Sequence, residues 1–404
     1  MKNNRTSSRL IAPTLLAASC LIVMCGTAVT AALPAIRAHF ASGRDPAEID
    51  LPVKLVLTTP SLAIALGAPV IGIIVDIWGR KGVLILSLLV ASIAGASGFV
   101  MTSLTAIIAI RVVHGLAVAG IATSATALAA DYFRGDRRTR FMGAQAGVMG
   151  YGAVAFLLMG GVLADIEWRM PFLMYLSGLL VLAPAMVSLR DLKRLRRPRV
   201  KEPLPPSARG AMAVICGLVF FTMVMYMIVP VQLPFHLEQI NGATGAQTGL
   251  ALAFGSLISA TVSMVYAQFR KRMGHAAIGL LCLALMGVGM LLMGPARGYV
   301  PVYLGLLVSS VGLGLMLPNM NVWVTAVAPG GSRGRALGVM NMFLFLGQFV
   351  SPVALQPVAE RWGLAATLTG GGAVLLAATI LGLPLLRLDR TAAIEDRAVR
   401  GTGA

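Results

Sequence analysis

The chain has 404 residues, of which 57% are hydrophobic and only 12% are charged, and its mean hydropathy is +0.85. An ordinary soluble domain carries about 25% charged residues, so this composition argues against a soluble enzyme. Apolar runs of about 20 residues are long enough to cross a bilayer as helices. The sequence therefore predicts an all-α membrane protein with about a dozen spans.

Hydropathy predicts twelve transmembrane helices, which we place in chain order at residues 10–35, 53–75, 82–101, 104–130, 141–163, 169–189, 210–234, 248–268, 275–294, 299–327, 336–357 and 364–386. The first run is too long for the apolar region of a signal peptide, so we expect an uncleaved helix. Four cysteines, at positions 20, 25, 216 and 282, fall inside apolar runs without metal-ligand spacing. We expect no disulfide, metal site or cofactor.

The basic residues lie on one side of these predicted helices. With the N-terminus inside the cell, 26 of the 33 Lys and Arg fall at cytoplasmic loops and ends. This is the asymmetry that the positive-inside rule requires. We therefore predict that both termini are cytoplasmic, and that the net charge of +18 reflects topology in the bilayer rather than a nucleic-acid partner.

The chain divides in the middle. Its longest internal hydrophilic stretch is basic and proline-rich, which predicts six-helix bundles at 1–190 and 210–404 joined by a linker at 191–209. The halves share residues at one offset of 195 positions: Gly79 and Gly274, Arg138 and Arg333, Arg140 and Arg335, and Gly143 and Gly338. Such internal repeats are typical of secondary transporters, whose solute site lies between the repeats.

The loop after the second predicted span carries a motif, Gly72-Ile-Ile-Val-Asp76-Ile-Trp-Gly79-Arg80-Lys81. It resembles the G-x-x-x-D-x-x-G-R-K signature of the major facilitator superfamily, in the 12-span drug:proton antiporter branch. The resemblance implies that Asp76 latches this loop to a neighbouring helix end, with Arg138 or Arg140 nearby. Gly72 would let helices approach, Gly79 would permit the turn, and Arg80 and Lys81 would hold the loop inside.

The fourth predicted span contains Arg111-Val-Val-His114-Gly115, which is similar to the family's R-x-x-Q-G motif with His114 in place of Gln. An arginine within a span is expensive and needs a polar partner. One hypothesis is that Arg111 attracts an anionic group or orders water while His114 senses or relays a proton. The alternative is that Arg111 braces helices through backbone carbonyls or reaches outward to the interface. Gly115 and Ala119 form a pair of small residues that permits close packing.

The fifth predicted span partly matches the glycine motif of the family's antiporters. Gly143, Gly152, Gly160 and Gly161 have the expected spacing, but Phe156 and Leu157 stand where the motif has Gly-Pro. Export by antiport is therefore favoured by the overall resemblance and weakened at this span.

The family's fold places predicted spans 1, 4, 7 and 10 around the solute cavity. Besides Arg111 and His114, the resemblance nominates these lining residues: Thr27, Thr30, Thr123, Tyr226, Gln232, Asn319, Asn321 and Trp323. We expect about half of them to be structural. None of the 15 acidic residues lies in the middle of a predicted span, so an organic cation would lack a counter-charge there.

These observations predict a secondary transporter, not an enzyme, that exports a small, amphipathic, neutral or anionic compound in exchange for protons. We expect a monomer in the plasma membrane, the inner membrane in a bacterium. One alternative is a copper(I) or metal-complex importer, suggested by the pairs Met223 and Met227, Met286 and Met290, and Met316 and Met320. Flexible packing explains such methionines more simply. The other alternative is a non-transporting receptor on the same fold.

Overall fold

A computed structural model describes residues 3–42, 45–191, 206–329 and 332–386. Its helices are α1 (Asn3–Thr27), η1 (Thr30–Ala32), α2 (Leu33–Phe40), α3 (Pro46–Trp78), α4 (Arg80–Ala96), η2 (Ser97–Phe99), α5 (Leu104–Tyr132), α6 (Asp136–Ile166), α7 (Met170–Leu173), η3 (Met174–Leu176), α8 (Ser177–Ser188), α9 (Pro206–Tyr226), α10 (Ile228–Asn241), α11 (Gly245–Arg270), α12 (His275–Met293), α13 (Tyr299–Val327), α14 (Arg333–Leu381) and η4 (Leu383–Leu385). The predicted all-α class is confirmed.

Eleven helical stretches of the described chain are long and apolar enough to cross a membrane. The last of them is the 49-residue α14, which is interrupted at Gly363 by a φ of 83°. A positive φ breaks a right-handed helix and suits glycine, which has no Cβ. α14 is therefore two helices on either side of Gly363, and the twelve predicted spans are accounted for.

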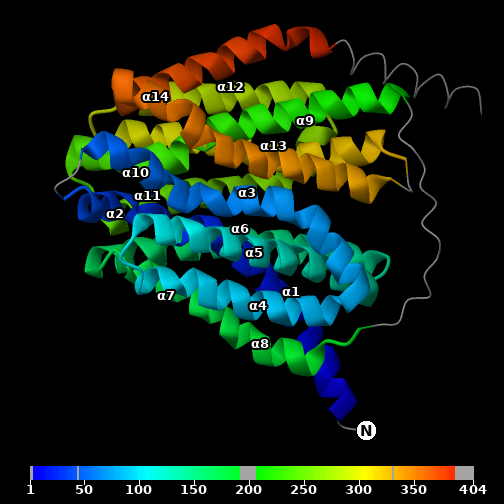
Figure 1. The fold of residues 1–404 in the computed structure, drawn as a ribbon. Coiled ribbons are helices and arrows are strands. Elements are labelled where there is room, and N and C mark those ends of the chain that lie inside the picture. The colour runs from blue at the N-terminus through cyan, green and yellow to red at the C-terminus, as the bar shows by residue number, and fades with distance from the viewer. Residues whose placement is uncertain (1–2, 43–44, 192–205, 330–331, 387–404) are drawn as a thin grey trace, which may run out of the picture.

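Most contacts between helices lie within one half of the chain. α1, α3, α4, α5, α6 and α8 pack with one another, as do α9, α10, α11, α12, α13 and α14. In Figure 1 the helices α4, α5, α7 and α8 lie on one side of the molecule, and α9, α12, α13 and α14 lie on the other. Division into bundles at 1–190 and 210–404 stays a prediction, and most of the predicted linker, residues 192–205, lies outside the described residues.

Two helix pairs form most of the contact between the halves. α6 packs against α11, and α3 packs against α14. The first pair is close because glycines face each other: a Cβ at Gly161 would lie 2.4 Å from the Gly245 carbonyl oxygen, and one at Gly249 would lie 2.4 Å from the Leu157 carbonyl oxygen. Small residues let membrane helices approach in this way.

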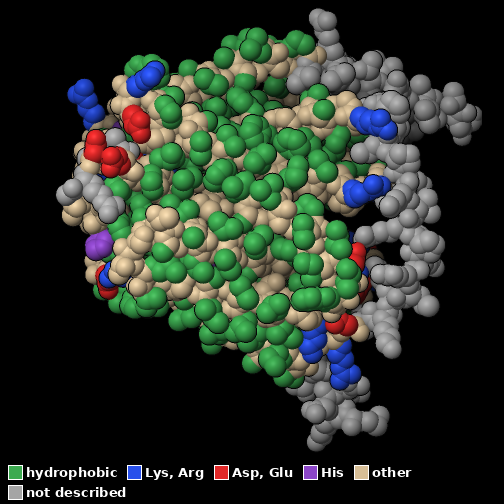
Figure 2. Space-filling view, viewed as in Figure 1, with side chains coloured by type: hydrophobic (Ala, Val, Ile, Leu, Met, Phe, Trp, Pro, Cys, Tyr) green, Lys and Arg blue, Asp and Glu red, His purple; other side chains and the backbone are tan. Residues whose placement is uncertain are grey.

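The spans end at two faces of the molecule. We call one the Gly79 end, where Lys81 meets Asp191, and the other the Asp165 end, where Asp165 meets the start of α11. In Figure 2 hydrophobic side chains cover the surface between the two ends, and charged side chains gather at the ends. At the Asp165 end, on the left of Figure 1, α2 approaches α10 of the other half.

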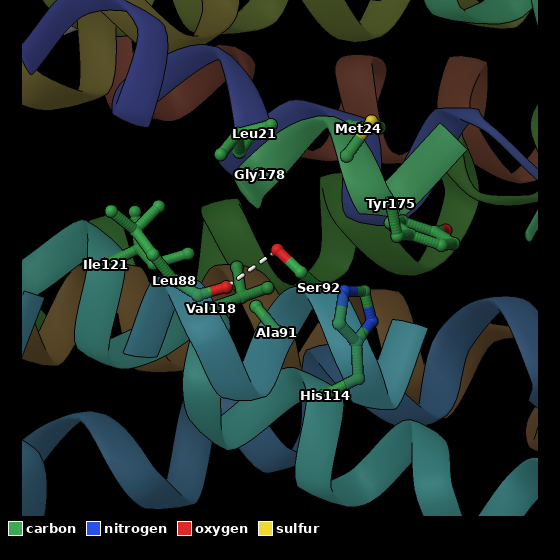
Figure 3. A pocket seen from close by; sticks show the side chains of 10 residues that line it. All are labelled: Leu21, Met24, Leu88, Ala91, Ser92, His114, Val118, Ile121, Tyr175 and Gly178. Carbon is green, nitrogen blue, oxygen red and sulfur yellow. Dashed lines mark hydrogen bonds between the residues drawn. The ribbon is translucent and has the colours of Figure 1, made fainter. Parts of the chain in front are cut away.

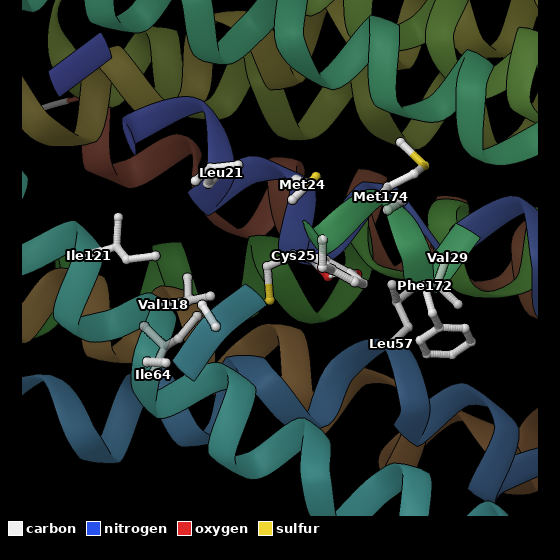
Figure 4. Close-up of a cluster of buried hydrophobic side chains, with 14 of the residues drawn as sticks. Leu21, Met24, Cys25, Val29, Leu57, Ile64, Val118, Ile121, Phe172 and Met174 are labelled. Carbon is white, nitrogen blue, oxygen red and sulfur yellow. Dashed lines mark hydrogen bonds between the residues drawn. The ribbon is translucent and has the colours of Figure 1, made fainter. Parts of the chain in front are cut away.

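Apolar side chains fill the interior of the first half. Leu21 and Met24 of α1 pack in one cluster with Val118 and Ile121 of α5, as Figure 4 shows. Burial from water does not drive the association of helices within lipid, so close van der Waals packing of this kind holds the bundle together.

Candidate functional site

The guanidinium of Arg111 is the centre of a buried polar network in the first half. Arg111 is fully buried on α5. Its Nε donates to the Val56 carbonyl oxygen at 2.8 Å, and Nη2 donates to the Cys25 carbonyl oxygen at 3.2 Å. Nη1 donates to the Tyr175 hydroxyl at 2.9 Å and lies 3.1 Å from His114 Nδ1. One side chain thus links α1, α3, α5 and η3.

The bond to Arg111 fixes the protonation of one nitrogen of His114. A guanidinium can only donate hydrogen bonds, so His114 Nδ1 accepts and carries no proton in this arrangement. The imidazole is 2% exposed and packs edge-on against the Tyr175 ring, with the ring centres 4.6 Å apart. A proton could bind Nδ1 only if the bond to Arg111 broke.

A small cavity lies beside His114. It has a volume of about 10 Å³, room for one water molecule. Figure 3 shows the imidazole reaching toward it from α5, opposite Ser92 of α4 and Tyr175. The Ser92 hydroxyl donates to the Leu88 carbonyl oxygen at 2.7 Å, within its own helix. In this conformation the cavity is too small for an organic solute.

The sequence identified Arg111 and His114 but not their partners. The contacts to Val56 and Cys25 are those of the bracing alternative, because both acceptors are backbone carbonyls. Nothing in the sequence pattern singled out Tyr175, which lies 64 residues from Arg111. Close packing at Gly115 is confirmed, since a Cβ there would lie 2.5 Å from the Pro60 carbonyl oxygen.

The signature loop is tied to two helix ends at the Gly79 end. Gly79 has a φ of 90°, which confirms the predicted turn. Arg80 forms an ion pair with the buried Asp131 at the end of α5. The Lys81 backbone N–H donates to Asp191 Oδ1 at 2.9 Å, and its ammonium donates to the Met186 carbonyl oxygen at 2.6 Å. Asp131 and Asp191 are partners of this loop that the sequence did not indicate.

The other two positions of the motif are Asp76 and Gly72. Asp76 is exposed near the end of α3, and its assignment as a latch stays a prediction. Gly72 does not sit at a close helix contact, because a Cβ there would meet no atom within 4 Å. The expectation that Gly72 lets helices approach is therefore wrong for this arrangement of the halves.

Three of the four antiporter-like glycines sit at tight contacts. A Cβ at Gly152 would lie 2.3 Å from Cys20 Sγ, one at Gly160 would lie 2.2 Å from the Ala28 carbonyl oxygen, and Gly161 faces α11. Gly143 differs, because a Cβ there would meet nothing within 4 Å. These glycines let α6 pack closely against both α1 and the second half.

The predicted cavity-lining residues are dispersed. Thr27 and Thr30 donate to carbonyl oxygens one turn earlier, at Val23 and Gly26. Thr123 and Tyr226 are half-buried, and Gln232 is buried with its Oε1 lacking a hydrogen-bond partner in the described structure.

Asn319 belongs to a separate network inside the second half. It is fully buried, accepts from the Tyr266 hydroxyl at 3.2 Å and donates to the His275 carbonyl oxygen at 2.9 Å. Trp323 stacks on the His275 ring, while Asn321 is exposed and donates to the Leu317 carbonyl oxygen within its own helix. The structure thus does not gather these residues around Arg111.

The methionine pairs lie mainly in the apolar core of the second half. The four that are fully buried, Met286, Met290, Met316 and Met320, pack among Leu, Val, Ile and Cys side chains. This is the environment expected of flexible apolar filler.

A second charged site lies between the halves at the Asp165 end. Lys54 of α3 is 2% exposed, and its Nζ donates to Gln356 Oε1 of α14 at 2.5 Å. It lines a cavity of about 130 Å³ together with Arg37, Asp50 and Phe235, among others. Lys54 is the second residue of the predicted span at 53–75, and the hydropathy pattern gave no sign that it would be buried between the halves.

Comparison with known proteins identifies the family. A sequence model of the Major Facilitator Superfamily matches residues 15–352 and also residues 214–403. The chain belongs to this superfamily. It is 28% identical over 338 residues to the class C tetracycline resistance protein of Escherichia coli, covering 79% of this chain and 83% of that one. It is 22% identical over 294 residues to multidrug resistance protein 1 of Bacillus subtilis, covering 71% and 75%.

Solved structures of other transporters share the fold. A D-xylose–proton symporter superposes with a TM-score of 0.76 at 14% identity, covering 93% of this chain and 97% of that one. The human organic anion transporter MFSD10 (TETRAN) superposes with a TM-score of 0.71 at 18% identity, covering 93% and 99%. The match to the superfamily model and to the resistance proteins makes this chain a multi-pass membrane transporter and not an enzyme.

Proposed function

We propose that this transporter exports a small, amphipathic, neutral or anionic organic compound in exchange for protons, by alternating access between its two halves. The similarity to tetracycline and multidrug resistance proteins over more than two thirds of the chain carries the proposal. A third relative, the cephamycin export protein CmcT of Amycolatopsis lactamdurans, is 31% identical over 229 residues, covering 55% of this chain and 45% of that one. In this proposal the Gly79 end faces the cytoplasm and the protein works as a monomer.

The charges of the described spans support the proposed solute class. The acidic residue of α5, Asp131, lies at the end of that helix and is paired with Arg80. Arg111 brings a fixed positive charge to the centre of the first half, beside His114. A cationic solute would meet a fixed positive charge there, and desolvating it without a counter-charge is costly. A neutral or anionic solute avoids that cost.

In this proposal His114 couples the proton to the packing of the helices. Protonation of Nδ1 would replace an acceptor with a donor that faces the Arg111 guanidinium, and the bond between them would be lost. Arg111 also holds α1 and α3 through carbonyl oxygens. A proton on His114 would thus loosen a brace that joins several spans, which is a route from proton binding to conformational change.

A growth-inhibition panel tests the export proposal. Cells that express the protein should tolerate several-fold higher concentrations of some members of a panel containing tetracyclines, β-lactams and neutral amphipathic inhibitors. The transport of each compound to which the cells become resistant is then measured in proteoliposomes with an imposed pH gradient. If no compound is protected, and none moves in proteoliposomes, the export proposal fails.

The variant His114→Gln tests the coupling role. A glutamine Oε1 can still accept from Arg111, so we expect the fold and solute binding to persist. Glutamine does not titrate, so the rate of transport should lose its dependence on pH between about 5.5 and 8. A pH profile identical to that of the wild type would place the coupling group elsewhere.

A further inference from the structure

Lys54, the buried lysine at the Asp165 end, contacts side chains of the other half of the molecule. Lys54 of α3 donates from Nζ to Gln356 Oε1 on α14, at 2.5 Å, so the bond crosses from one half to the other. Nζ also lies 5.4 Å from the centre of the Phe235 ring on α10. The side chain can keep these contacts only while the halves are closed at this end.

The charged side chains around Lys54 come from four helices: Arg37 on α2, Asp50 on α3, Glu238 on α10 and Glu360 on α14. Two of the acids are already engaged. Asp50 Oδ1 accepts from Arg37 Nε at 2.5 Å, and Glu360 Oε1 accepts from the Gln356 amide at 2.9 Å. Glu238 is exposed at the rim of the cavity. Within the described chain, no carboxylate forms an ion pair with Lys54.

When the two halves are closed at this end, the Lys54 ammonium therefore has too few hydrogen-bond partners. A charged lysine has three N–H donors, and the structure gives it one neutral acceptor and one aromatic face. Removing an ammonium from water is costly unless a paired charge replaces the water, and the attraction of an aromatic ring is smaller than that cost. When the halves part at this end, water can surround the amine again.

We propose that Lys54 is a proton-operated gate: a proton on its amine drives the Asp165 end open, and loss of that proton lets the end close. The cavity of about 130 Å³ beside Lys54 has room for several water molecules, which could carry the proton from the rim at Glu238 and Gln239. The gate requires two halves that open and close, as in this superfamily, and does not depend on which solute is exported or in which direction.

Distance measurements between spin labels test the gate without any transported solute. Ser42, beyond α2, and Asn241, at the end of α10, are exposed at the Asp165 end, one in each half. Labels are attached there by substitution to cysteine, after the four native cysteines are replaced by alanine. The purified protein is placed in lipid nanodiscs between pH 6 and pH 10. We expect the ratio of short to long distances to rise about tenfold with pH in the wild type.

Two variants separate the charge of Lys54 from its other contacts. Lys54→Met has a similar length and no charge, so the closed distance should dominate at every pH. Lys54→Arg is charged at every pH used, so the open distance should dominate and should not respond to pH. Either variant alone is informative if the other does not fold.

A matched control lies in the same interface. The Ser61 hydroxyl donates to Gln348 Oε1 at 2.9 Å, again between α3 and α14, without a charged group. Ser61→Ala should keep the pH response of the wild type. Any of three results would overturn the proposal: label distances of the wild type that do not change with pH, label distances of Lys54→Met that still change with pH, or a Lys54→Met variant that shows mainly the open distance.

Discussion

At the scale of single residues, Arg111 makes the largest set of buried polar contacts in the first half. Its guanidinium donates to two carbonyl oxygens, a hydroxyl and an imidazole nitrogen. A planar fork with five N–H donors suits partners that lie in several directions, and a lysine ammonium cannot reproduce it. The residue is thus a structural anchor as well as a candidate for solute binding.

We therefore expect Arg111→Lys to reduce stability. The ammonium would leave several of the four acceptors without a donor, and each unsatisfied buried group costs about 1–3 kcal/mol. The melting temperature of the protein in detergent should fall by several degrees, as measured by thermal unfolding with a thiol-reactive dye. Arg270→Lys is the control, because Arg270 is exposed and should tolerate the change. An unchanged melting temperature for Arg111→Lys would contradict the bracing role.

The sequence predicted some residues of the site because they stand in motifs or break the hydrophobic pattern. Arg111 and His114 are polar groups inside an apolar run, and Gly79 precedes two basic residues in a recognisable loop. Their partners could not be predicted. Tyr175 and the Cys25 carbonyl oxygen meet Arg111 only after four helices have packed, and a backbone carbonyl leaves no mark in a sequence.

At the scale of helices, the hydropathy pattern predicted each span because a bilayer requires long apolar runs. It could not predict whether a proline inside a span would interrupt the helix. α3 contains Pro52, Pro60 and Pro69 and stays helical, since neighbouring helices can satisfy the carbonyl groups that proline frees. Gly363 breaks α14 through a positive φ, directly before the start of the last predicted span at residue 364, so hydropathy separated these two helices at the right place.

The contact between α6 and α11 gives a prediction at this scale. A methyl group at Gly249 would lie 2.4 Å from the Leu157 carbonyl oxygen, which is fixed in the backbone of α6. Gly249→Ala should therefore push the helices apart, lengthen the distance between labels at Ser42 and Asn241, and lower export several-fold. Gly147→Ala is the control, since a Cβ there meets nothing within 4 Å. Equal label distances in both variants would show that this contact does not hold the Asp165 end closed.

At the scale of the whole molecule, the two halves meet most closely toward the Asp165 end. Asp165 accepts from the backbone N–H groups of Gly245 at 2.5 Å and of Ala246 at 2.9 Å, so a carboxylate of the first half caps a helix of the second. A negative charge is stabilising at a helix N-terminus. The second helix pair between the halves, α3 and α14, is joined by the hydrogen bond from Lys54 to Gln356. The repeat in the sequence predicted two similar halves, but not which side chains would join them.

The orientation of the molecule in the membrane is the last prediction. Most of the basic residues lie at the Gly79 end or in segments that adjoin it in sequence, and positively charged loops are retained in the cytoplasm. In cells expressing a variant without native cysteines, Ser42→Cys should react with a membrane-impermeant maleimide from outside. Arg137→Cys, exposed at the Gly79 end, should react only after the membrane is permeabilised. Labelling of Arg137→Cys in intact cells would show that the assigned orientation is wrong. The gate at Lys54 would then open toward the cytoplasm instead of the outside.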